Sequence, residues 1–187
     1  MGAKKLSPVE LVESCLKRIA AVNGTVNAFV ALDEERALAQ AREIEAEIAQ
    51  GRDPGPLAGL PVGIKDLVNV KGLRSTYGSL LFKDPVPDAD DGQITRLRDA
   101  GAIILGKTNT PEFGSGANTT NRVYGATTNP FDPARTPAMS GWSSRAWAKA
   151  WRNFAERARN TRLIPSSTGA DPRSSEKATR SLPRSAG

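Results

Sequence analysis

A lysine at the end of a predicted buried strand is the first residue of this sequence that could do chemistry. Lys65 follows an apolar run at residues 60–64 that turn residues bound. Desolvation at such a position favours the neutral amine, which can accept a proton as a general base. The alternative is an ordinary lysine that is solvated or paired with the neighbouring Asp66. Taken alone, these few residues favour the alternative.

A second lysine lies in a pattern that is typical of phosphate-binding loops. Residues 101–108 satisfy G-x-x-x-x-G-K-[ST], in which backbone N–H groups cradle phosphates and the hydroxyl binds magnesium. Such a loop opens directly into a helix, whereas residues 102–105 are a strand-like apolar run and Pro111 delays any helix. We therefore expect a buried strand that ends at Gly106, with nucleotide binding around Lys107 as the minor alternative.

The composition excludes several familiar catalytic centres. The chain of 187 residues contains no histidine and a single cysteine, Cys15. Ser-His-Asp triads, Cys-His pairs and histidine-based zinc sites are therefore excluded, and Cys15 cannot form an internal disulfide. No run of apolar residues approaches the length of a membrane span, and no export signal opens the chain. We expect a cytoplasmic protein that uses no metal ion and no cofactor.

Helices and strands must position these side chains. Residues 7–10 form a capping box with proline at the first helical position, and apolar residues at helical spacing follow until Asn23 and Gly24 end the run. A second helix is predicted from about Asp33 to Gln50. Its shallow apolar face indicates that it lies on the surface. Residues 114–137 are rich in Gly, Asn and Thr and predict a long loop. Helices followed by strands favour a layered α/β domain.

Three motifs carry a specific resemblance. They occupy residues 60–66, 106–113 and 125–137, with the sequences Leu-Pro-Val-Gly-Ile-Lys-Asp, Gly-Lys-Thr-Asn-Thr-Pro-Glu-Phe and Gly-Ala-Thr-Thr-Asn-Pro-Phe-Asp-Pro-Ala-Arg-Thr-Pro. Their order and spacing resemble the amidase signature family over residues 6–137. The resemblance implies a serine hydrolase of carbon–nitrogen bonds that uses a serine, a serine in a cis peptide and a lysine. It also implies the N-terminal part of a mixed twisted sheet flanked by helices, in incomplete form.

The resemblance assigns roles to individual residues. Lys65 is the general base, which takes a proton from the cis serine as that serine relays it from the nucleophile. Asn118, Thr119 and Thr120 match a polar segment beside the substrate, although plain loop-capping by these side chains is an equal alternative. The implied substrate is a small amide. Some members of this family work as one subunit of a larger complex, so the resemblance leaves open a partner subunit of unknown identity.

The sequence departs from the family pattern after Pro137. Ser140 occupies the position of the cis serine, but the flanking glycines of the family are replaced by Ala138, Met139 and Trp142. No motif equivalent to that of the nucleophilic serine follows. We therefore expect a truncated or frameshifted chain of an amidase family, with little or no amide hydrolysis of its own.

Charge and aliphatic content divide the chain at the same place. Residues 1–137 carry 16 Lys and Arg against 17 Asp and Glu, whereas residues 138–187 carry 10 against 3. We expect a partial amidase-signature domain at 6–137 and a basic, poorly ordered tail at 138–187 that is disordered or translated out of frame. The alternative is a noncatalytic binding protein whose tail engages RNA or an anionic membrane.

Overall fold

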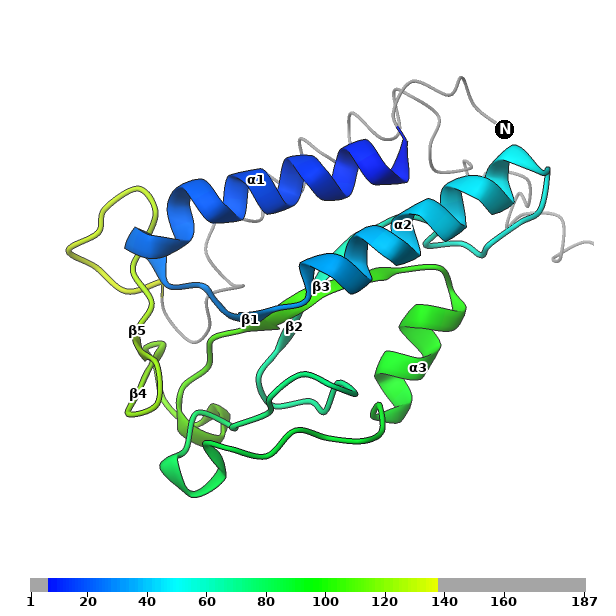
Figure 1. Cartoon of the computed structure of the whole chain (residues 1–187). Coiled ribbons are helices and arrows are strands. Elements are labelled where there is room, and N and C mark those ends of the chain that lie inside the picture. The colour runs from blue at the N-terminus through cyan, green and yellow to red at the C-terminus, as the bar shows by residue number, and fades with distance from the viewer. Residues whose placement is uncertain (1–6, 138–187) are drawn as a thin grey trace, which may run out of the picture.

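The structure is a computed structural model, and it describes residues 7–137 of the chain. They form a mixed α/β unit with two helices on one side of a three-stranded sheet and a third helix on the other (Figure 1). The layered α/β class predicted from the sequence is confirmed. The helices are α1 (Pro8–Val26), α2 (Glu34–Ala49) and α3 (Gly92–Asp99), and the strands are β1 (Phe29–Leu32), β2 (Pro61–Lys65), β3 (Ile103–Thr108), β4 (Thr120–Asn121) and β5 (Gly125–Ala126).

Helix α1 begins where the capping box predicts. The Glu10 backbone N–H donates to the Ser7 Oγ at 3.0 Å, and the Ser7 N–H donates to the Glu10 carboxylate at 2.9 Å. Two N–H groups that have no partner inside the helix are thereby satisfied. Pro8, at the first helical position, has no N–H that would need a partner. The start of the helix is therefore encoded within four residues.

The predicted end of this helix is wrong by two residues. Helix α1 continues through Gly24 to Val26, and Asn27 ends it in the left-handed conformation with φ of 52°. The Asn23 side chain accepts a hydrogen bond from the Phe29 N–H at 2.8 Å and donates one to the Phe29 carbonyl at 2.9 Å. Asn23 therefore fastens the helix to strand β1 and does not end the helix.

Helix α2 lies within one residue of its predicted range at each end. The Arg36 N–H donates to the Asp33 side chain at 3.3 Å, which caps the helix. Its narrow apolar stripe packs on α1 and β3 while its other face is exposed, as predicted. The core under the two helices consists of Val12, Leu16, Ile19, Phe29, Ala37, Ala41, Ile44, Ile103 and Leu105.

Strand β3 is the centre of the sheet, which has the order β1-β3-β2. Strand β1 pairs with it antiparallel and strand β2 pairs with it parallel. All six residues of β3 are buried, and the strand continues two residues beyond Gly106, where the sequence predicts its end. A second core lies on the opposite face of the sheet, beside α3, and consists of Ile64, Val70, Leu73, Ile94 and Ile104.

Some elements have no counterpart in the sequence-based prediction. Strand β1 has only four residues, which is too short for a period to be recognised. Helix α3 begins with Gly92 and buries a single residue, Ile94, so it has almost no apolar stripe. Strands β4 and β5 form a two-residue pairing inside the predicted loop. In the part of the chain that the structure describes, no helix is long and apolar enough to cross a membrane.

Candidate functional site

Lys65 is the last residue of β2 and lies beside Thr108, the last residue of β3. Parallel strands end at the same edge of a sheet, so this edge gathers the residues that follow both strands. The Lys65 side chain is half-buried, and its ammonium makes no hydrogen bond or ion pair within residues 7–137. The sequence-based placement of this lysine at the end of a strand is therefore confirmed.

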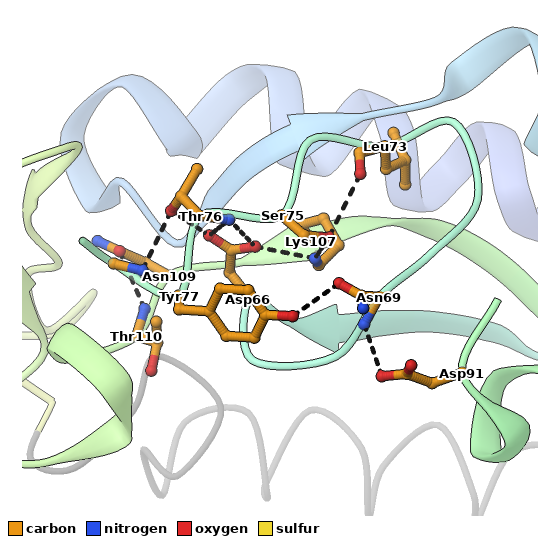
Figure 2. Close-up of polar contacts among 11 residues, drawn as sticks. Asp66, Asn69, Leu73, Ser75, Thr76, Tyr77, Asp91, Lys107, Asn109 and Thr110 are labelled. Atoms are coloured by element: carbon orange, nitrogen blue, oxygen red, sulfur yellow. Dashed lines mark hydrogen bonds and ion pairs between the residues drawn. The ribbon is translucent and has the colours of Figure 1, made fainter. Parts of the chain in front are cut away.

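A different lysine binds the carboxylate that follows Lys65. The Lys107 Nζ lies 2.8 Å from an oxygen of the Asp66 carboxylate, and both side chains are 0% exposed (Figure 2). Lys107 also donates to the Ser75 Oγ at 2.7 Å. The interpretation of Lys65 as a lysine paired with Asp66 is therefore wrong.

Thr76 completes the coordination of the Asp66 carboxylate. Its backbone N–H lies 3.2 Å from both carboxylate oxygens, and its Oγ1 donates to one of them at 2.6 Å (Figure 2). The Gly78 N–H in turn donates to the Thr76 Oγ1 at 3.1 Å. A buried carboxylate with a cation and two further donors has its hydrogen-bonding partners satisfied and is held in one position.

A bulge in β3 turns Lys107 toward Asp66. In the β2–β3 register Val62 pairs with Ile104 but Gly63 pairs with Gly106, so one residue of β3 is extra. Such a bulge reverses the alternation of side chains beyond it. Lys107, the register partner of Ile64, therefore lies on the face of the second core, where segment 66–79 crosses the sheet.

Burial sets the electrostatics of this lysine. Removal of water lowers the pKa of the Lys107 ammonium, and the hydrogen bond and charge of Asp66 oppose that effect. Asp91 adds a smaller opposing charge. Nearby, burial raises the pKa of the Tyr124 hydroxyl, and the Arg74 guanidinium lies over the Tyr124 ring at 5.1 Å. The pair of Lys107 and Asp66 is therefore a structural ion pair in a site that excludes water.

The phosphate-loop pattern does not form a phosphate loop. Residues 103–108 are a buried strand, and the next regular element is a 3-10 turn at Glu112–Gly114. The Lys107 ammonium is already committed to Asp66 and Ser75. The hypothesis of nucleotide binding at this pattern is therefore wrong on geometry.

The three predicted substrate-side residues differ in their surroundings. Asn118 and Thr120 are exposed, whereas Thr119 is fully buried. The Asn118 side chain accepts a hydrogen bond from the Thr136 hydroxyl at 2.8 Å, which fits the loop-capping alternative. Within residues 7–137 no hydrogen bond joins these residues to Lys65, so their substrate-side role stays a prediction.

Asn109 is a residue at this edge for which the sequence predicts no role. It is fully buried, and its Nδ2 donates to the Thr127 hydroxyl at 3.0 Å. The Asn121 Nδ2 donates to the Asn109 Oδ1 at 2.7 Å and to the Thr110 carbonyl at 2.8 Å. This network ties the end of β3 to the loop at 118–127, and the motif at 106–113 gives its only sequence signal.

Three buried hydroxyls have no hydrogen-bond partner within the described residues. They belong to Thr108, the register partner of Lys65, to Thr119 and to Tyr124. Buried hydroxyls without a partner are uncommon in folded proteins. Ser140, the predicted counterpart of the cis serine, lies outside the described residues.

Comparison with known proteins places this arrangement in a family. The amidase family model matches residues 10–144 of the chain. This chain belongs to the amidase signature family. The resemblance predicted from three sequence motifs is thereby confirmed.

Curated relatives include one component of an amidotransferase. The chain is 42% identical over 146 residues to the A subunit of the glutamyl-tRNA(Gln) amidotransferase from Cutibacterium acnes, covering 78% of the chain and 29% of that protein. It is 41% identical over 171 residues to the corresponding protein of an Azoarcus species, covering 91% of the chain and 33% of that protein. The second match extends beyond residue 137, so the boundary predicted there stays a prediction. The chain spans about a third of the length of these relatives.

Solved structures share the fold of the described residues. A bacterial aryl acylamidase of the amidase signature family has a TM-score of 0.68 at 32% identity, over 74% of this chain and 29% of that one. A protein from a vestigial complex that reveals the origins of an s-triazine catabolic enzyme has a TM-score of 0.70 at 38% identity, over 73% and 30%. The mixed α/β arrangement in Figure 1 is therefore part of the amidase-signature fold.

Proposed function

We propose that this chain carries the general base, Lys65, of a domain that hydrolyses the carbon–nitrogen bond of a small amide. The observation that carries the proposal is the state of Lys65 at the shared end of β2 and β3. Its ammonium has no partner within residues 7–137, while the adjacent carboxylate of Asp66 is fully engaged elsewhere. An ammonium that no carboxylate binds is free to take part in proton transfer.

The proposed chemistry is acyl transfer to a serine and then to water. A serine hydroxyl adds to the amide carbonyl, and its proton passes through a second serine, in a cis peptide, to the neutral Lys65 amine. Collapse of the adduct breaks the carbon–nitrogen bond, and the proton returns from Lys65 through the same relay to the leaving amine. Water then adds to the acyl-enzyme by the same route and releases the acid. Of these groups, only Lys65 belongs to the described residues.

The same proposal makes the chain inactive when it is alone. Ser140 lacks the flanking glycines of the cis serine, and no nucleophile motif follows it in the sequence. Loss of the nucleophile removes nearly all covalent catalysis in serine hydrolases. Catalysis by this proposal therefore requires two serines that these 187 residues do not supply in the family's motifs.

A chimaeric protein tests the role of Lys65. Residues 1–137 are fused to the remainder of a full-length relative, which supplies the serines, and hydrolysis of a panel of small amides is measured by release of ammonia or amine. We expect turnover by the chimaera, a loss of at least about a hundredfold in Lys65→Met, and no turnover by the 187-residue chain.

Lys71→Met is the matched control, because Lys71 lies six residues away and its side chain is exposed. Turnover by the chimaera that survives in Lys65→Met would refute the proposed role. Turnover by the unmodified chain would refute the proposed inactivity.

A second candidate function rests on the charge of residues 138–187. This segment carries a net charge of +7 with Trp147, Trp151 and Phe154 at helical spacing, a pattern typical of binding to RNA or to an anionic membrane. Such binding needs no catalytic serine. The cytoplasmic location expected from the sequence stays a prediction.

A further inference from the structure

Lys65 and Asp66 carry opposite charges on consecutive residues. An ion pair between neighbouring side chains would favour the protonated form of the lysine and would oppose its use as a base. A protein that needs a free lysine at this position must therefore engage the carboxylate in another way. This requirement applies to any chain in which the proposed base precedes an aspartate.

We propose that Lys107 is a positioning residue for Lys65, because it binds the Asp66 carboxylate and so keeps Asp66 from pairing with the Lys65 ammonium. This inference rests on the proposed function, since it concerns the same lysine. Lys107 itself does not touch the substrate in this proposal. Its role is to leave Lys65 free for proton transfer.

Strand geometry places the side chains of Lys65 and Lys107 on opposite faces of the sheet. Lys65 pairs in register with Thr108, and Ile64 pairs with Lys107. Side chains of consecutive strand residues point to opposite faces, so Lys65 lies on the face away from Ile64 and Lys107. The bulge at Gly106 brings Lys107 to the face of Ile64 and the second core. On that face the Lys107 ammonium meets the Asp66 carboxylate (Figure 2).

The close approach at Gly106 fixes the bulge. A Cβ at this position would overlap the carbonyl oxygen of Ala31 on the neighbouring strand. Only glycine therefore permits this path of β3, and without the bulge the alternation would direct Lys107 to the other face.

Backbone hydrogen bonds hold the turn that joins the two residues. The Asp66 N–H donates to the Thr108 carbonyl at 2.9 Å, and the Lys65 carbonyl accepts from the Leu67 N–H at 2.7 Å and the Val68 N–H at 3.2 Å. With its carboxylate bound by Lys107 and Thr76, Asp66 is held through both its backbone and its side chain. Lys65 is therefore attached to a fixed point of the sheet.

Other charged groups surround the pair and stay unchanged in the test. The charge of Asp91 raises the pKa of the Lys107 ammonium. The charges of Asp66 and Arg74 both act on the Tyr124 hydroxyl, and the Arg74 guanidinium lies over the Tyr124 ring. The two donors of Thr76 still bind the Asp66 carboxylate when Lys107 loses its charge. Removal of the Lys107 charge alone therefore leaves an unbalanced negative charge one residue from Lys65.

The reactivity of Lys65 in the 187-residue chain tests this inference without amidase activity. Trace acetylation with acetic anhydride is measured from about pH 7 to about pH 10, the range in which lysine amines become reactive. Peptide mass spectrometry gives the labelling of Lys65 relative to that of the exposed Lys71 in the same molecules. Circular dichroism confirms that each variant is folded.

Three variants separate charge from structure. Lys107→Gln removes the charge and keeps a donor for Asp66 and Ser75, and we expect it to lower relative labelling of Lys65 about tenfold. Lys107→Gln with Asp66→Asn removes both charges, and labelling should return to the wild-type value. Asp66→Asn alone leaves the Lys107 charge unbalanced, so it should give labelling of Lys65 equal to or above the wild-type value.

Either of two results would overturn the inference. Unchanged labelling in a folded Lys107→Gln variant means that Asp66 does not reach Lys65, and equal loss of labelling in the double variant means that Lys107 acts only on structure. If Lys107→Gln does not fold, Asp66→Asn decides, because a fall in Lys65 labelling on removal of the Asp66 charge contradicts a carboxylate that competes for the Lys65 ammonium. The proposed function fails separately, if the chimaera keeps its activity in Lys65→Met.

Discussion

Lys107 is a fully buried lysine whose ammonium has one carboxylate partner, Asp66, and one hydroxyl partner, Ser75. Loss of one member of a buried ion pair leaves an uncompensated charge away from water, which costs about 3–5 kcal/mol. We therefore expect Lys107→Met to lower the free energy of unfolding by about 3–5 kcal/mol. Urea denaturation followed by circular dichroism measures the change.

Two further variants make this prediction specific. Lys107→Met with Asp66→Asn should lose less stability than Lys107→Met alone, because no charge then remains buried. Arg52→Met removes an exposed ion pair, in which the guanidinium lies 3.7 Å from the Glu47 carboxylate, and should cost no more than about 1 kcal/mol. Equal losses in the free energy of unfolding for Lys107→Met and Arg52→Met would show that the buried ion pair is no more costly to break than an exposed one.

Local sequence predicts the place of Lys65 but not the partner of Asp66. The apolar run before Lys65 and its turn residues identify a strand end without knowledge of the fold. The pairing of Asp66 with Lys107 joins residues from different strands, and the pattern around Lys107 is typical of a phosphate loop. Only the register of β2 on β3 and the bulge at Gly106 bring the two together.

At the scale of elements, two glycines have opposite expected effects. Gly106 lies where a Cβ would overlap the Ala31 carbonyl oxygen, a backbone atom that cannot rotate away. Gly24 lies inside α1, and an added Cβ there would have no atom within 4 Å. We expect Gly106→Ala to lower the free energy of unfolding by at least about 1–3 kcal/mol, and Gly24→Ala to raise it by about 0.5–1 kcal/mol.

The two variants are compared in one urea titration series. The gain in Gly24→Ala follows from the lower conformational entropy of alanine in the unfolded chain and from its higher propensity for a helix interior. A loss of stability in Gly24→Ala would mean that α1 ends before Gly24, as the sequence alone predicts. Full stability in Gly106→Ala would mean that β3 follows a path without the bulge.

Element starts are more local than element ends in this protein. Capping side chains within four residues fix the start of α1, and Asp33 does the same for α2. The end of α1 depends on Asn23 binding the backbone of β1, an element that is too short to predict. The sequence does not predict helix α3 either, because the position of this helix follows from its packing in the second core and not from its own apolar pattern.

At the scale of the whole molecule, the order of the motifs predicts the family, and buried hydrogen bonds explain how the motifs are held together. Three short motifs suffice for the family because each lies at the shared end of β2 and β3 or in the loop tied to that end. The buried network of Asn109 with Asn121 and Thr127 shows why: the motifs hold one another in place. No periodicity in the sequence reports such contacts between distant polar side chains.

Charge is also distributed at this scale, since residues 1–137 have a net charge of −1 and residues 138–187 a net charge of +7. If the basic segment binds nucleic acid, its deletion should abolish the affinity of the chain for single-stranded RNA, measured by fluorescence anisotropy. Each phosphate that it neutralises should contribute about 0.7 to the slope of log Kd against log salt.

A variant of the 187-residue chain with Arg145, Lys149, Arg152 and Arg159 changed to Gln keeps the three tryptophans and separates charge from stacking. It should bind RNA more weakly and with a shallower salt slope than the wild type, because fewer phosphates are neutralised. Vesicles with an anionic lipid, tested with the same variants, distinguish a membrane from RNA as the target. RNA binding that survives deletion of residues 138–187, or that is independent of salt, would exclude the basic segment as the binding element and leave amide hydrolysis as the proposed function.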